Sequence, residues 1–593
     1  MMHHLSHSAF LQLNLLLGQR FPWTSAEEKE TVGKCHAQLL APELLAMIFH
    51  DVMALHERQP IILLPMDEKH LENEIDTEPL LALSHVCRYW RDVALGTPAL
   101  WTRIHGGRRD QMEAFLERSR PLTVTLFLDV EHQGGKWYGP LPEKLASVVE
   151  ARGPRLHRLD LSMIPSWDNV VPLLGSLKAP QLECLTITCS SPGGLFRDIG
   201  PSWGPLLHDD VSSLRALALM PVTDWLPSST FPHLTHLVLF FDPEVPPPHH
   251  PFDLLRLLSN VPALAFLFLF YEESHMGNWR PPSQPILLRH LRSLVFTCCS
   301  YKLIRTVVSH LSLPEDVFIR LQDIDSPLGV DGAPAPLPPL PLRPVTSLDV
   351  VMRDEEILMV ADGSASGLWL ESHHEPGGAA DPQAYQDWVG WLLTLHECLT
   401  LSHVTYLHIY VDGRQTFWPA FLAHLPQVSH LAVLLGKPGV EIDVLTGPYV
   451  ESSPTTTLCD ALAQEAPILC PALRTLTLEW SKRIVAENLE NLPELSKMLR
   501  TRSRAGHPIR HVVVQAPWPS FDNFVRCQDF IEALARTISP RVADCEIVAE
   551  EGVGARGCCA FEMRDVWKVD GEDTYWEVGD YEKPHYALPR GLV

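Results

Sequence analysis

The sequence predicts an α/β protein in which an all-helical N-terminal module precedes an irregular solenoid built around a parallel sheet. Three observations predict this fold. Helical patterns occur in residues 39–49 and 80–104, a spaced triplet of apolar residues recurs between residues 156 and 514, and further helical patterns separate many of the triplets. Alternation of strand and helix along a chain favours a parallel sheet with helices packed against it.

The composition is that of a large folded protein with an acidic surface. The chain has 593 residues, of which 46% are hydrophobic and 20% charged, and it contains 52 prolines. At about 100–200 residues per domain, this length predicts several domains or a repeat array. The formal charge is 47 minus 72, or −25. Because an acidic surface repels phosphate backbones, nucleic acid is not an expected partner.

The cysteines and the N-terminus predict neither a disulfide framework nor a membrane anchor. The thirteen cysteines are scattered without a Cys-x-x-Cys spacing, so we expect no zinc site. Gln12 and Asn14 interrupt the apolar run of residues 10–17, and no Lys or Arg precedes it. Such a run is a poor signal peptide and is too short to span a membrane. We therefore expect a cytoplasmic or nuclear protein.

Residues 80–104 predict an amphipathic helix followed by a turn. Four apolar residues recur at spacings of three and four and therefore line one helical face, namely Leu83, Val86, Trp90 and Val93. Gly96 and Pro98 end this helix. A second helical pattern lies upstream in residues 39–49, where Pro42 suits the first helical turn.

Together the two halves resemble the fungal F-box family. Four ordered pieces carry the resemblance, namely Leu-Ala-Pro-Glu-Leu at 40–44, Ile-Phe at 48–49, Val-Cys-Arg-Tyr-Trp-Arg at 86–91 and Pro-Ala-Leu-Trp at 98–101. Motifs in a fixed order are more specific than any single residue. The chain departs from the family at Ala41, where Leu is usual, and in the insertion of residues 54–79 between the halves.

The resemblance implies that residues 35–105 are a helical F-box module that binds a Skp-type adaptor and, through it, a cullin-RING ubiquitin ligase. It implies adaptor contacts from residues of both halves: Leu40, Pro42, Leu44, Ile48, Phe49, Leu83, Val86, Cys87, Trp90, Leu100 and Trp101. The same spacing also fits a helical hairpin whose apolar side chains fill a core. Spacing alone leaves open which of these residues face an adaptor and which point inward.

The recurring triplet consists of an apolar residue, two variable residues, an apolar residue, one variable residue and an apolar residue. Its copies begin at Leu156, Leu182, Leu214, Leu234, Leu264, Leu291, Val345, Val404, Val428, Leu473 and Ile509. The last two apolar positions alternate with variable residues, as in a strand with one buried face. Helical patterns lie between many copies, namely at residues 168–177, 252–259, 301–311, 383–399 and 527–538.

These units resemble the leucine-rich repeat family, which implies a solenoid over residues 152–515. Unit spacing is irregular, and the usual Asn position holds other residues, so we expect a divergent array. The Pro-rich stretch 332–344 interrupts it and favours extended polyproline II structure, either as a stiff loop between repeat blocks or as a ligand for an SH3- or WW-like module. We further predict an N-terminal extension (1–34), a connecting segment (106–151) and a C-terminal cap with an acidic tail (516–593).

A target-binding surface is predicted on the sheet face opposite the repeated leucines. Strand side chains alternate between faces, and the middle strands place four phenylalanines on that face: Phe240, Phe266, Phe268 and Phe270. If exposed, this aromatic patch is a suitable anchor for a target protein. Alternatively, loops such as residues 243–251 cover the phenylalanines and make them core.

Two glycine-containing motifs match the patterns of catalytic or nucleotide-binding sites, but simpler interpretations fit their surroundings better. Residues 552–557 match the dinucleotide-loop pattern, but they lie beside Glu550 and Glu551, so a Gly-rich turn is the better interpretation. Ser202 lies in a Gly-Pro-Ser-Trp-Gly sequence without the preceding apolar strand or following helix of a nucleophile elbow, which favours a surface loop. We expect no catalytic residues, no metal and no cofactor.

The resemblance implies a substrate-recognition adaptor of a Skp-cullin-F-box ubiquitin ligase. We expect the F-box to bind the Skp-type adaptor and the repeats to bind an unknown target protein. The alternative is a non-catalytic repeat scaffold whose degenerate F-box does not bind the adaptor, for which the insertion at residues 54–79 is the reason. A third hypothesis is an enzyme that uses Ser202 or the Gly-rich turn.

Overall fold

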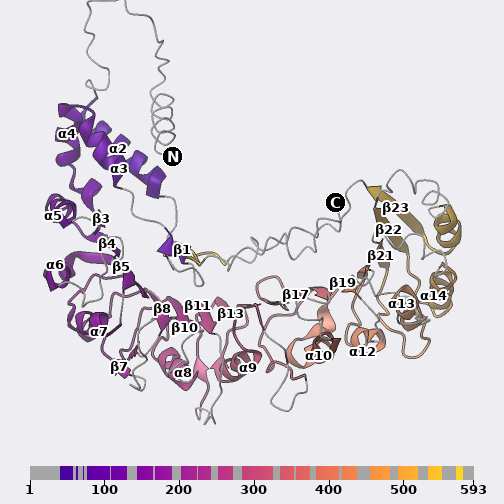
Figure 1. Cartoon of the computed structure of the whole chain (residues 1–593). Helices are drawn as coiled ribbons and strands as arrows, with labels where there is room; N and C mark the ends of the chain where they lie inside the picture. The colour runs from indigo at the N-terminus through magenta and orange to yellow at the C-terminus, as the bar shows by residue number, and fades with distance from the viewer. Residues whose placement is uncertain are drawn as a thin grey trace, which may run out of the picture.

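The chain has a helical N-terminal region followed by a large, mostly parallel α/β region (Figure 1). The computed structural model describes residues 40–57, 62–63, 71–72, 77–106, 109–129, 143–164, 167–189, 202–222, 225–241, 251–271, 284–324, 327, 334–352, 356–373, 382–412, 417–436, 454–480, 492–517, 532–550 and 569–578. The predicted N-terminal extension lies outside these residues.

The helical region contains α2 (Pro42–Glu57), α3 (Glu78–His85), α4 (Arg88–Leu95) and the 3₁₀ turn η2 (Pro98–Trp101). The prediction of one continuous helix through residues 83–93 was wrong. The backbone of Cys87 is extended, and its sulfur accepts a hydrogen bond from the amide of Trp90, so Cys87 caps a new helix. Val86 therefore lies at the junction of two helices and is exposed instead of joining the buried face.

The sheet begins earlier than expected. Residues 103–105 form strand β3 (Arg103–His105) inside the region predicted to be all helical. The predicted connecting segment contains α5 (Arg109–Arg118), β4 (Val124–Asp129) and α6 (Glu143–Arg152), and β4 pairs in parallel with both β3 and β5. Apolar alternation at Val124, Leu126 and Leu128 is the strand signal that residues 106–151 contained.

Every copy of the apolar triplet ends in a strand of the sheet. These strands are β5 (Leu156–Ile164), β6 (Cys184–Cys189), β8 (Ala216–Val222), β10 (His236–Phe241), β11 (Phe266–Tyr271), β13 (Ser293–Thr297), β16 (Ser347–Met352), β19 (Tyr406–Asp412), β20 (His430–Gly436), β21 (Thr475–Trp480) and β22 (His511–Pro517). Leu237 of β10 lies opposite Leu217 of β8 and Leu267 of β11, so the repeated leucines are in register.

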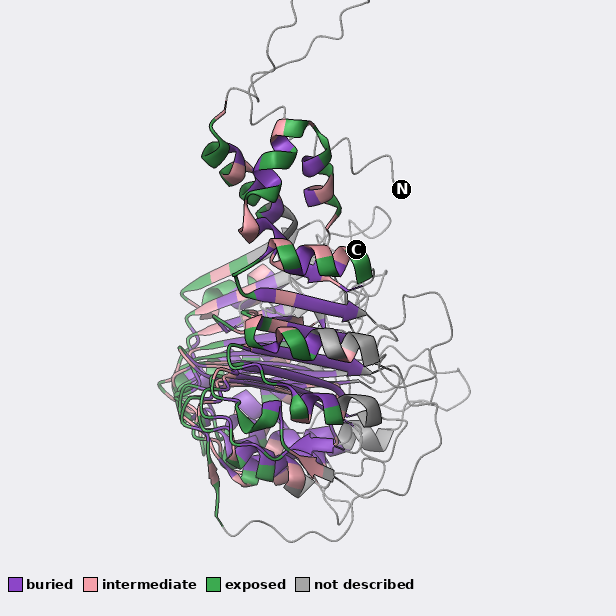
Figure 2. Cartoon of the chain, turned by 90° about the vertical axis from the view of Figure 1, so that its left-hand side faces the viewer, coloured by how far each residue is buried: buried purple, intermediate pink, exposed green. Residues whose placement is uncertain are grey.

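Helices cover one side of the sheet. They include α7 (Trp167–Ser176), α8 (Pro251–Ser259), α9 (Tyr301–Ser309), α10 (Pro382–Leu393), α11 (Leu395–Cys398), α12 (Trp418–Leu422), α13 (Pro454–Leu462) and α14 (Leu492–Arg504). Figure 1 shows an open arc with helices along its outer side and strands along its inner side. The leucines of the triplets lie in one continuous core between these two layers, and Figure 2 shows the buried strands stacked beneath the helical region.

The sheet is not parallel throughout. After β15 (Phe318–Gln322) the chain forms β16, β17 (Glu356–Asp362) and β18 (Gly367–His373) as an antiparallel meander, and β18 returns to pair with β15 while β16 pairs with β19. Short connections between these three strands permit only antiparallel pairing. The prediction of a wholly parallel sheet was therefore wrong at this point.

The Pro-rich stretch precedes this meander and packs against the helical layer. From residue 334 to residue 344 it has no helix or strand pairing beyond an isolated bridge at Pro334. Leu337 is buried, the amide of Leu340 donates to the carbonyl of Cys398, and the hydroxyl of Tyr301 donates to the carbonyl of Ala335. These contacts are those of a fixed connection between the two parts of the sheet.

The last strand of the sheet is β23 (Asp544–Glu550), which pairs in parallel with β22. Small sheets of two or three strands join β7 (Ser202–Gly204) to β9 (Trp225–Pro227), β12 (Ile286–Leu287) to β14 (Leu311–Ser312), and β1 (Ile62–Leu63) to β2 (Leu71–Glu72) and β24 (Glu577–Val578). In the described part of the chain, no ladder pairs β23 with β3, which agrees with the open arc in Figure 1.

Part of the predicted C-terminal cap and tail lies away from the end of the sheet. In the described segment Val569–Val578, strand β24 pairs with β1 of the insertion between the helices. The tail therefore brings residues of the two ends of the sequence together on the inner side of the arc.

Candidate functional site

The inner face of the first half of the sheet, from β5 to β15, has polar ends and an apolar centre. The strand registers place its side chains in rows across the strands: Arg158, Cys184, Ala216, His236, Phe266, Ser293 and Phe318 in one, and Asp160, Thr186, Ala218, Val238, Phe268, Val295 and Arg320 in the next. Phe240, Phe270, Thr297 and Gln322 belong to a third row. We call this surface the inner face.

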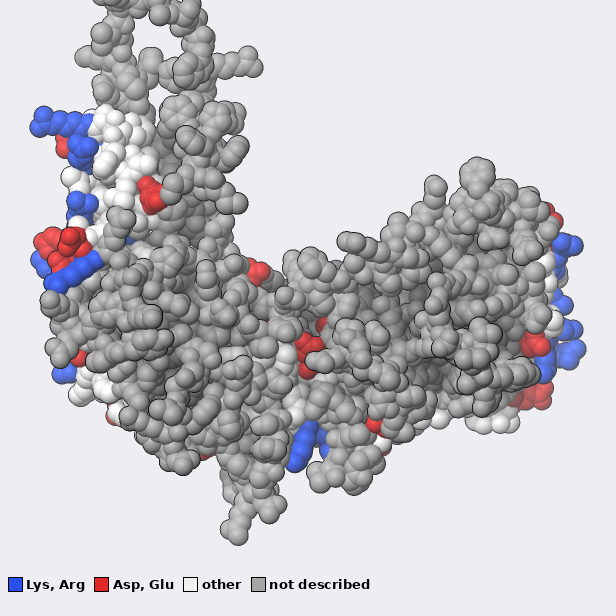
Figure 3. All heavy atoms as spheres, in the orientation of Figure 1, with Lys and Arg blue, Asp and Glu red and all other residues white. Residues whose placement is uncertain are grey.

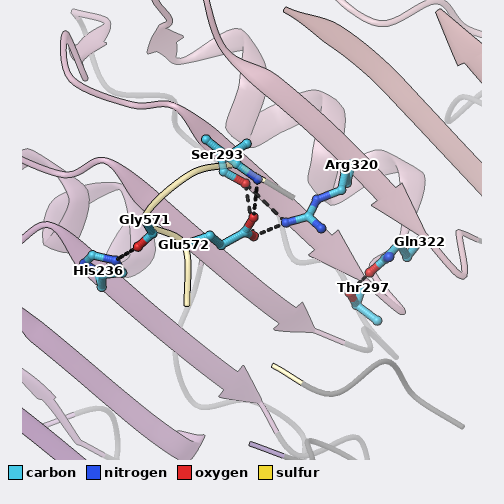
Figure 4. Close-up of polar contacts among 8 residues, drawn as sticks. His236, Ser293, Thr297, Arg320, Gln322, Gly571 and Glu572 are labelled. Atoms are coloured by element: carbon cyan, nitrogen blue, oxygen red, sulfur yellow. Dashed lines mark hydrogen bonds and ion pairs between the residues drawn. The ribbon is translucent and has the colours of Figure 1, made fainter. Parts of the chain in front are cut away.

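The tail segment Val569–Val578 covers the inner face. Trp576 is 2% exposed and packs in a cluster with Cys184, Ala216 and Ala218. Its indole N–H donates to the hydroxyl of Thr186 at 2.8 Å. At the other end of the segment, Glu572 forms an ion pair with Arg320 (Figure 4). The segment thus crosses the strands instead of extending along one of them.

The four predicted target-binding phenylalanines are part of this covered surface. Phe240, Phe266 and Phe270 are buried, and Phe268 is half-buried. Phe240 and Phe270 share a cluster with Trp576 and with Leu63 of β1. The patch is therefore not exposed, and the described residues that cover it belong to the tail and the insertion. Of the loop that was expected to cover it, residues 243–250 lie outside the described part of the chain.

Burial on the inner face perturbs its ionisable groups. The Arg158 guanidinium donates to the Asp160 carboxylate at 2.8 Å, and both side chains are largely buried. Burial is the largest single influence and acts to lower the pKa of Arg158, but the charge and hydrogen bond of Asp160, together with Cys184 and Tyr575, outweigh it and the pKa is raised. Burial raises the pKa of the Cys184 thiol to about 12, which leaves it a neutral side chain rather than a thiolate nucleophile.

The helical region has a core made by five of the predicted adaptor contacts. Phe49, Leu83, Trp90, Leu100 and Trp101 are all buried. The rings of Phe49 and Trp90 are 5.2 Å apart, which joins α2 to α4. The indole N–H of Trp101 donates to the carbonyl of Ala94 at 2.8 Å. These side chains hold the helices together and are not available to a partner in this arrangement.

The remaining predicted contacts divide by exposure. Leu40, Ile48 and Cys87 are half-buried, whereas Pro42, Leu44 and Val86 are exposed. Sequence reasoning missed Met47, which is 61% exposed one helical turn after Leu44. The hydroxyl of Tyr89 donates to the carbonyl of Leu40 at 2.6 Å, which places the start of α2 beside the α3–α4 junction. Leu44, Met47 and Val86 therefore lie at one end of the helical region, and we call them the apolar end.

Exposed apolar residues grouped on a small helical unit are typical of a protein-binding surface. Figure 3 shows uncharged atoms over part of the helical region, with basic atoms at its outer edge. Residues 42–106 match the family model described as F-box-like. The chain contains an F-box-like region. A comparison with curated proteins finds no match.

The F-box-like match includes more than the helices. It spans the insertion and ends at Gly106, directly after β3, so its last residues belong to the first strand of the sheet. A side chain at Gly106 would meet Leu128 at 2.2 Å, and this close approach of β3 to β4 favours glycine there. The F-box-like region and the sheet therefore share a strand and form one continuous core.

Of the two glycine-containing motifs, only the one around Ser202 lies in the described part of the chain. Ser202 begins the short strand β7, which pairs with β9, so the surface loop expected there is a strand. After Gly204 the chain enters a short 3₁₀ turn at Leu207–Asp209 rather than the helix that a nucleophile elbow needs. Residues 552–557 lie outside the described part of the chain.

Within the residues that the structure describes, no group of three or more His, Cys, Asp or Glu side chains is arranged to hold a metal ion. No helix in the same residues is both long enough and apolar enough to cross a membrane.

Proposed function

We propose that the chain is the substrate-recognition subunit of a Skp-cullin-F-box ubiquitin ligase, working in the cytoplasm or nucleus. The apolar end of the F-box-like region binds a Skp-type adaptor. The curved α/β region, a divergent leucine-rich-repeat-like solenoid of the kind found beside fungal F-boxes, binds the target protein. The observation that carries this proposal is the F-box-like match at residues 42–106 together with the exposed Leu44, Met47 and Val86.

The mechanism is tethering without catalysis by this chain. A receptor that holds a target beside the transfer machinery raises the local concentration of the target, so it needs binding surfaces and no reactive side chains. The shared core supports this role, because a receptor whose F-box-like region is continuous with its sheet holds the target in a fixed orientation.

Co-purification with a Skp-type adaptor tests the proposal. Leu44→Arg and Val86→Arg each place a charge in the apolar end, and we expect each to weaken adaptor binding at least tenfold, because burying an unpaired charge is costly. Leu287→Arg is the matched control, since Leu287 is 46% exposed on β12 and lies outside the F-box-like region. Adaptor binding that is the same in all three variants contradicts the proposal.

Trp90→Ala is a different kind of variant. Trp90 is buried against Phe49, so its loss removes core packing and is expected to reduce both stability and adaptor binding. Loss of binding in this variant alone does not identify a contact. Pro42→Arg is the more informative partner, because Pro42 is exposed at the start of α2.

A scaffold with an F-box that does not bind the adaptor is the second candidate, and the insertion favours it. The structure places β1 of the insertion against β24 of the tail. Failure of the wild-type chain to bind any Skp-type adaptor supports the scaffold and excludes the receptor.

A further inference from the structure

The tail segment Val569–Val578 is a short acidic turn with aromatic residues at its C-terminal end. Four of its residues are carboxylates, namely Asp570, Glu572, Asp573 and Glu577, and none is Lys or Arg. The amide of Glu572 donates to the carbonyl of Val569 at 2.9 Å, which closes the turn. Gly571 has a φ of +92°, a conformation that favours glycine, and it lies against the ring of Phe266.

The first anchor of the segment is the Glu572 carboxylate. It forms an ion pair with Arg320 and accepts a hydrogen bond from the hydroxyl of Ser293 at 3.3 Å (Figure 4). The side chains of Arg320 and Glu572 are each only 18% exposed. Arg320 and Ser293 come from neighbouring strands, β15 and β13, so the sheet builds an acid-binding position on its inner face.

Three side chains bind the backbone of the segment, two from strands β5 and β10 and one from the residue directly before β13. Arg292 donates to the carbonyl of Asp570 and His236 to that of Gly571, each at 2.9 Å. Arg158 donates to the carbonyl of Tyr575 at 2.9 Å. Donors aimed at backbone carbonyls recognise a peptide backbone in this conformation whatever its side chains are, and they fix its direction across the strands.

The second anchor is Trp576. Its indole ring fills an apolar site on β6 and β8, and Thr186 accepts the hydrogen bond from its N–H. Thr186 is itself 0% exposed. A buried hydroxyl that meets an indole N–H distinguishes Trp from Phe at this position, because Phe leaves the hydroxyl without that donor. The two anchors, Glu572 and Trp576, are four residues apart.

The charges on the two surfaces are complementary, because the tail segment is acidic and the inner face binds it through arginines. The whole chain carries a net charge of −25, yet the side chains that contact the segment include Arg158, Arg292 and Arg320. An acidic peptide is the class of ligand that such a surface attracts on an otherwise acidic protein.

We propose that the inner face is a peptide-binding surface for target segments that carry a carboxylate followed four residues later by Trp, and that Val569–Val578 occupies this surface in place of a target. This inference rests on the proposed receptor function and names its target class. Because the tail is part of the same chain, its binding is intramolecular and its effective concentration is high, on the order of millimolar. A target must therefore compete with the tail, which excludes weak ligands.

The test uses the full-length chain and a fluorescently labelled synthetic peptide, Val-Asp-Gly-Glu-Asp-Thr-Tyr-Trp-Glu-Val, with the sequence of residues 569–578. In the double variant Glu572→Ala/Trp576→Ala the tail loses both anchors, and we expect it to bind the peptide at least tenfold more tightly than the wild-type chain, measured by fluorescence anisotropy. Glu577→Ala is the matched control, since Glu577 joins the surface through its backbone pairing with Ile62, and it should bind the peptide like the wild type.

Specificity is tested on the same open chain. Adding Arg320→Ala, or replacing Glu or Trp in the peptide with Ala, should reduce peptide binding at least tenfold. The proposal is overturned if the open chain does not bind the peptide, or if Arg320→Ala leaves binding unchanged. If the double variant does not fold, Glu572→Ala alone is used. Trp576 then still occupies its site, so we expect a smaller gain in peptide affinity over the wild type, and the absence of any gain overturns the proposal.

Adaptor binding is measured in parallel, so that the two proposals fail separately. An open chain that binds the adaptor but not the peptide overturns this inference and leaves the receptor function standing. A chain that binds the peptide but no Skp-type adaptor supports the peptide surface and contradicts the receptor function.

Discussion

The two halves of the sheet share one design on their outer side and differ on their inner side. In both halves the repeated apolar residues are in register and buried under helices, as at Leu237 in the first half and Leu431 in the second. On the inner side, Thr186 and Ala218 of the first half are 0% exposed. In the corresponding row of the second half, His408 and Ala432 are also buried, but Glu546 at the end of the sheet is exposed.

The difference follows from composition at the same register positions. The inner face of the first half is apolar at its centre, and a parallel sheet with two apolar faces needs cover on both. The tail and β1 supply part of that cover. Toward the end of the second half, the row that corresponds to Thr186 and Ala218 contains Thr477, Val513 and Glu546, which are half-buried or exposed. The sheet there has its inner face open to solvent.

The largest expected effect is a loss of stability on substitution at the inner face of the first half. Phe270→Ala removes a side chain that is 0% exposed, and we expect a loss of about 3–5 kcal/mol in the free energy of unfolding, as for other buried aromatics. Val513→Ala at a half-buried position of the second half should cost less than about 1 kcal/mol. Denaturant unfolding of both variants measures the contrast, and equal losses would show that the two inner faces do not differ.

The outer side should show no such contrast. Leu237→Ala and Leu431→Ala each remove a side chain that is 1% exposed from the continuous core, and we expect each to cost about 2–5 kcal/mol. Hydrogen exchange resolved by strand should localise each loss to its own half, because distant core sites act independently. A large loss for Leu237→Ala with none for Leu431→Ala contradicts a shared outer design.

A smaller effect concerns the ion pair that fixes the tail. Glu572→Gln keeps the shape of the side chain but removes the charge that Arg320 neutralises, and we expect the attachment of the tail to weaken by about 1–2 kcal/mol. Faster hydrogen exchange in residues 569–578, with unchanged exchange in β20–β22, is the expected result. Unchanged exchange in the tail would mean that the pair contributes nothing to attachment.

The strands of the sheet were predictable because their signal is local and repeated. Each apolar triplet specifies which side chains enter the core, and neighbouring units carry the same pattern. A wrong assignment of one unit therefore does not change the predicted fold. Glu356–Asp362 was missed because its apolar run lies between triplets and pairs in the opposite direction. The Asp-Gly-Ser-Ala-Ser-Gly sequence after it was the available hairpin signal.

The site was less predictable because its contacts join residues far apart in the sequence. The phenylalanines were placed on the correct face by alternation alone, but their cover comes from Trp576, which no local pattern relates to Phe240. In the F-box-like region, helical spacing grouped Val86 with Trp90, and only the cap at Cys87 separates the exposed residue from the buried one. Sequence patterns specify faces, whereas the packing of distant segments decides exposure.

The smallest expected effect is a pH dependence of tail attachment through His236. Burial lowers the pKa of His236 below its ordinary value, although the Gly571 carbonyl and the Glu572 charge act in the opposite direction. The attached state therefore favours neutral His236, so its contribution is complete above the ordinary histidine pKa of about 6.5 and is lost as the pH falls through the lowered value. We expect the hydrogen-exchange protection factor of residues 569–578 to fall a few-fold between pH 7.5 and pH 5.5. In His236→Gln, which keeps an N–H donor for Gly571 but does not titrate, this pH dependence should disappear. Equal protection of the wild-type chain at both pH values would show that His236 does not control attachment of the tail.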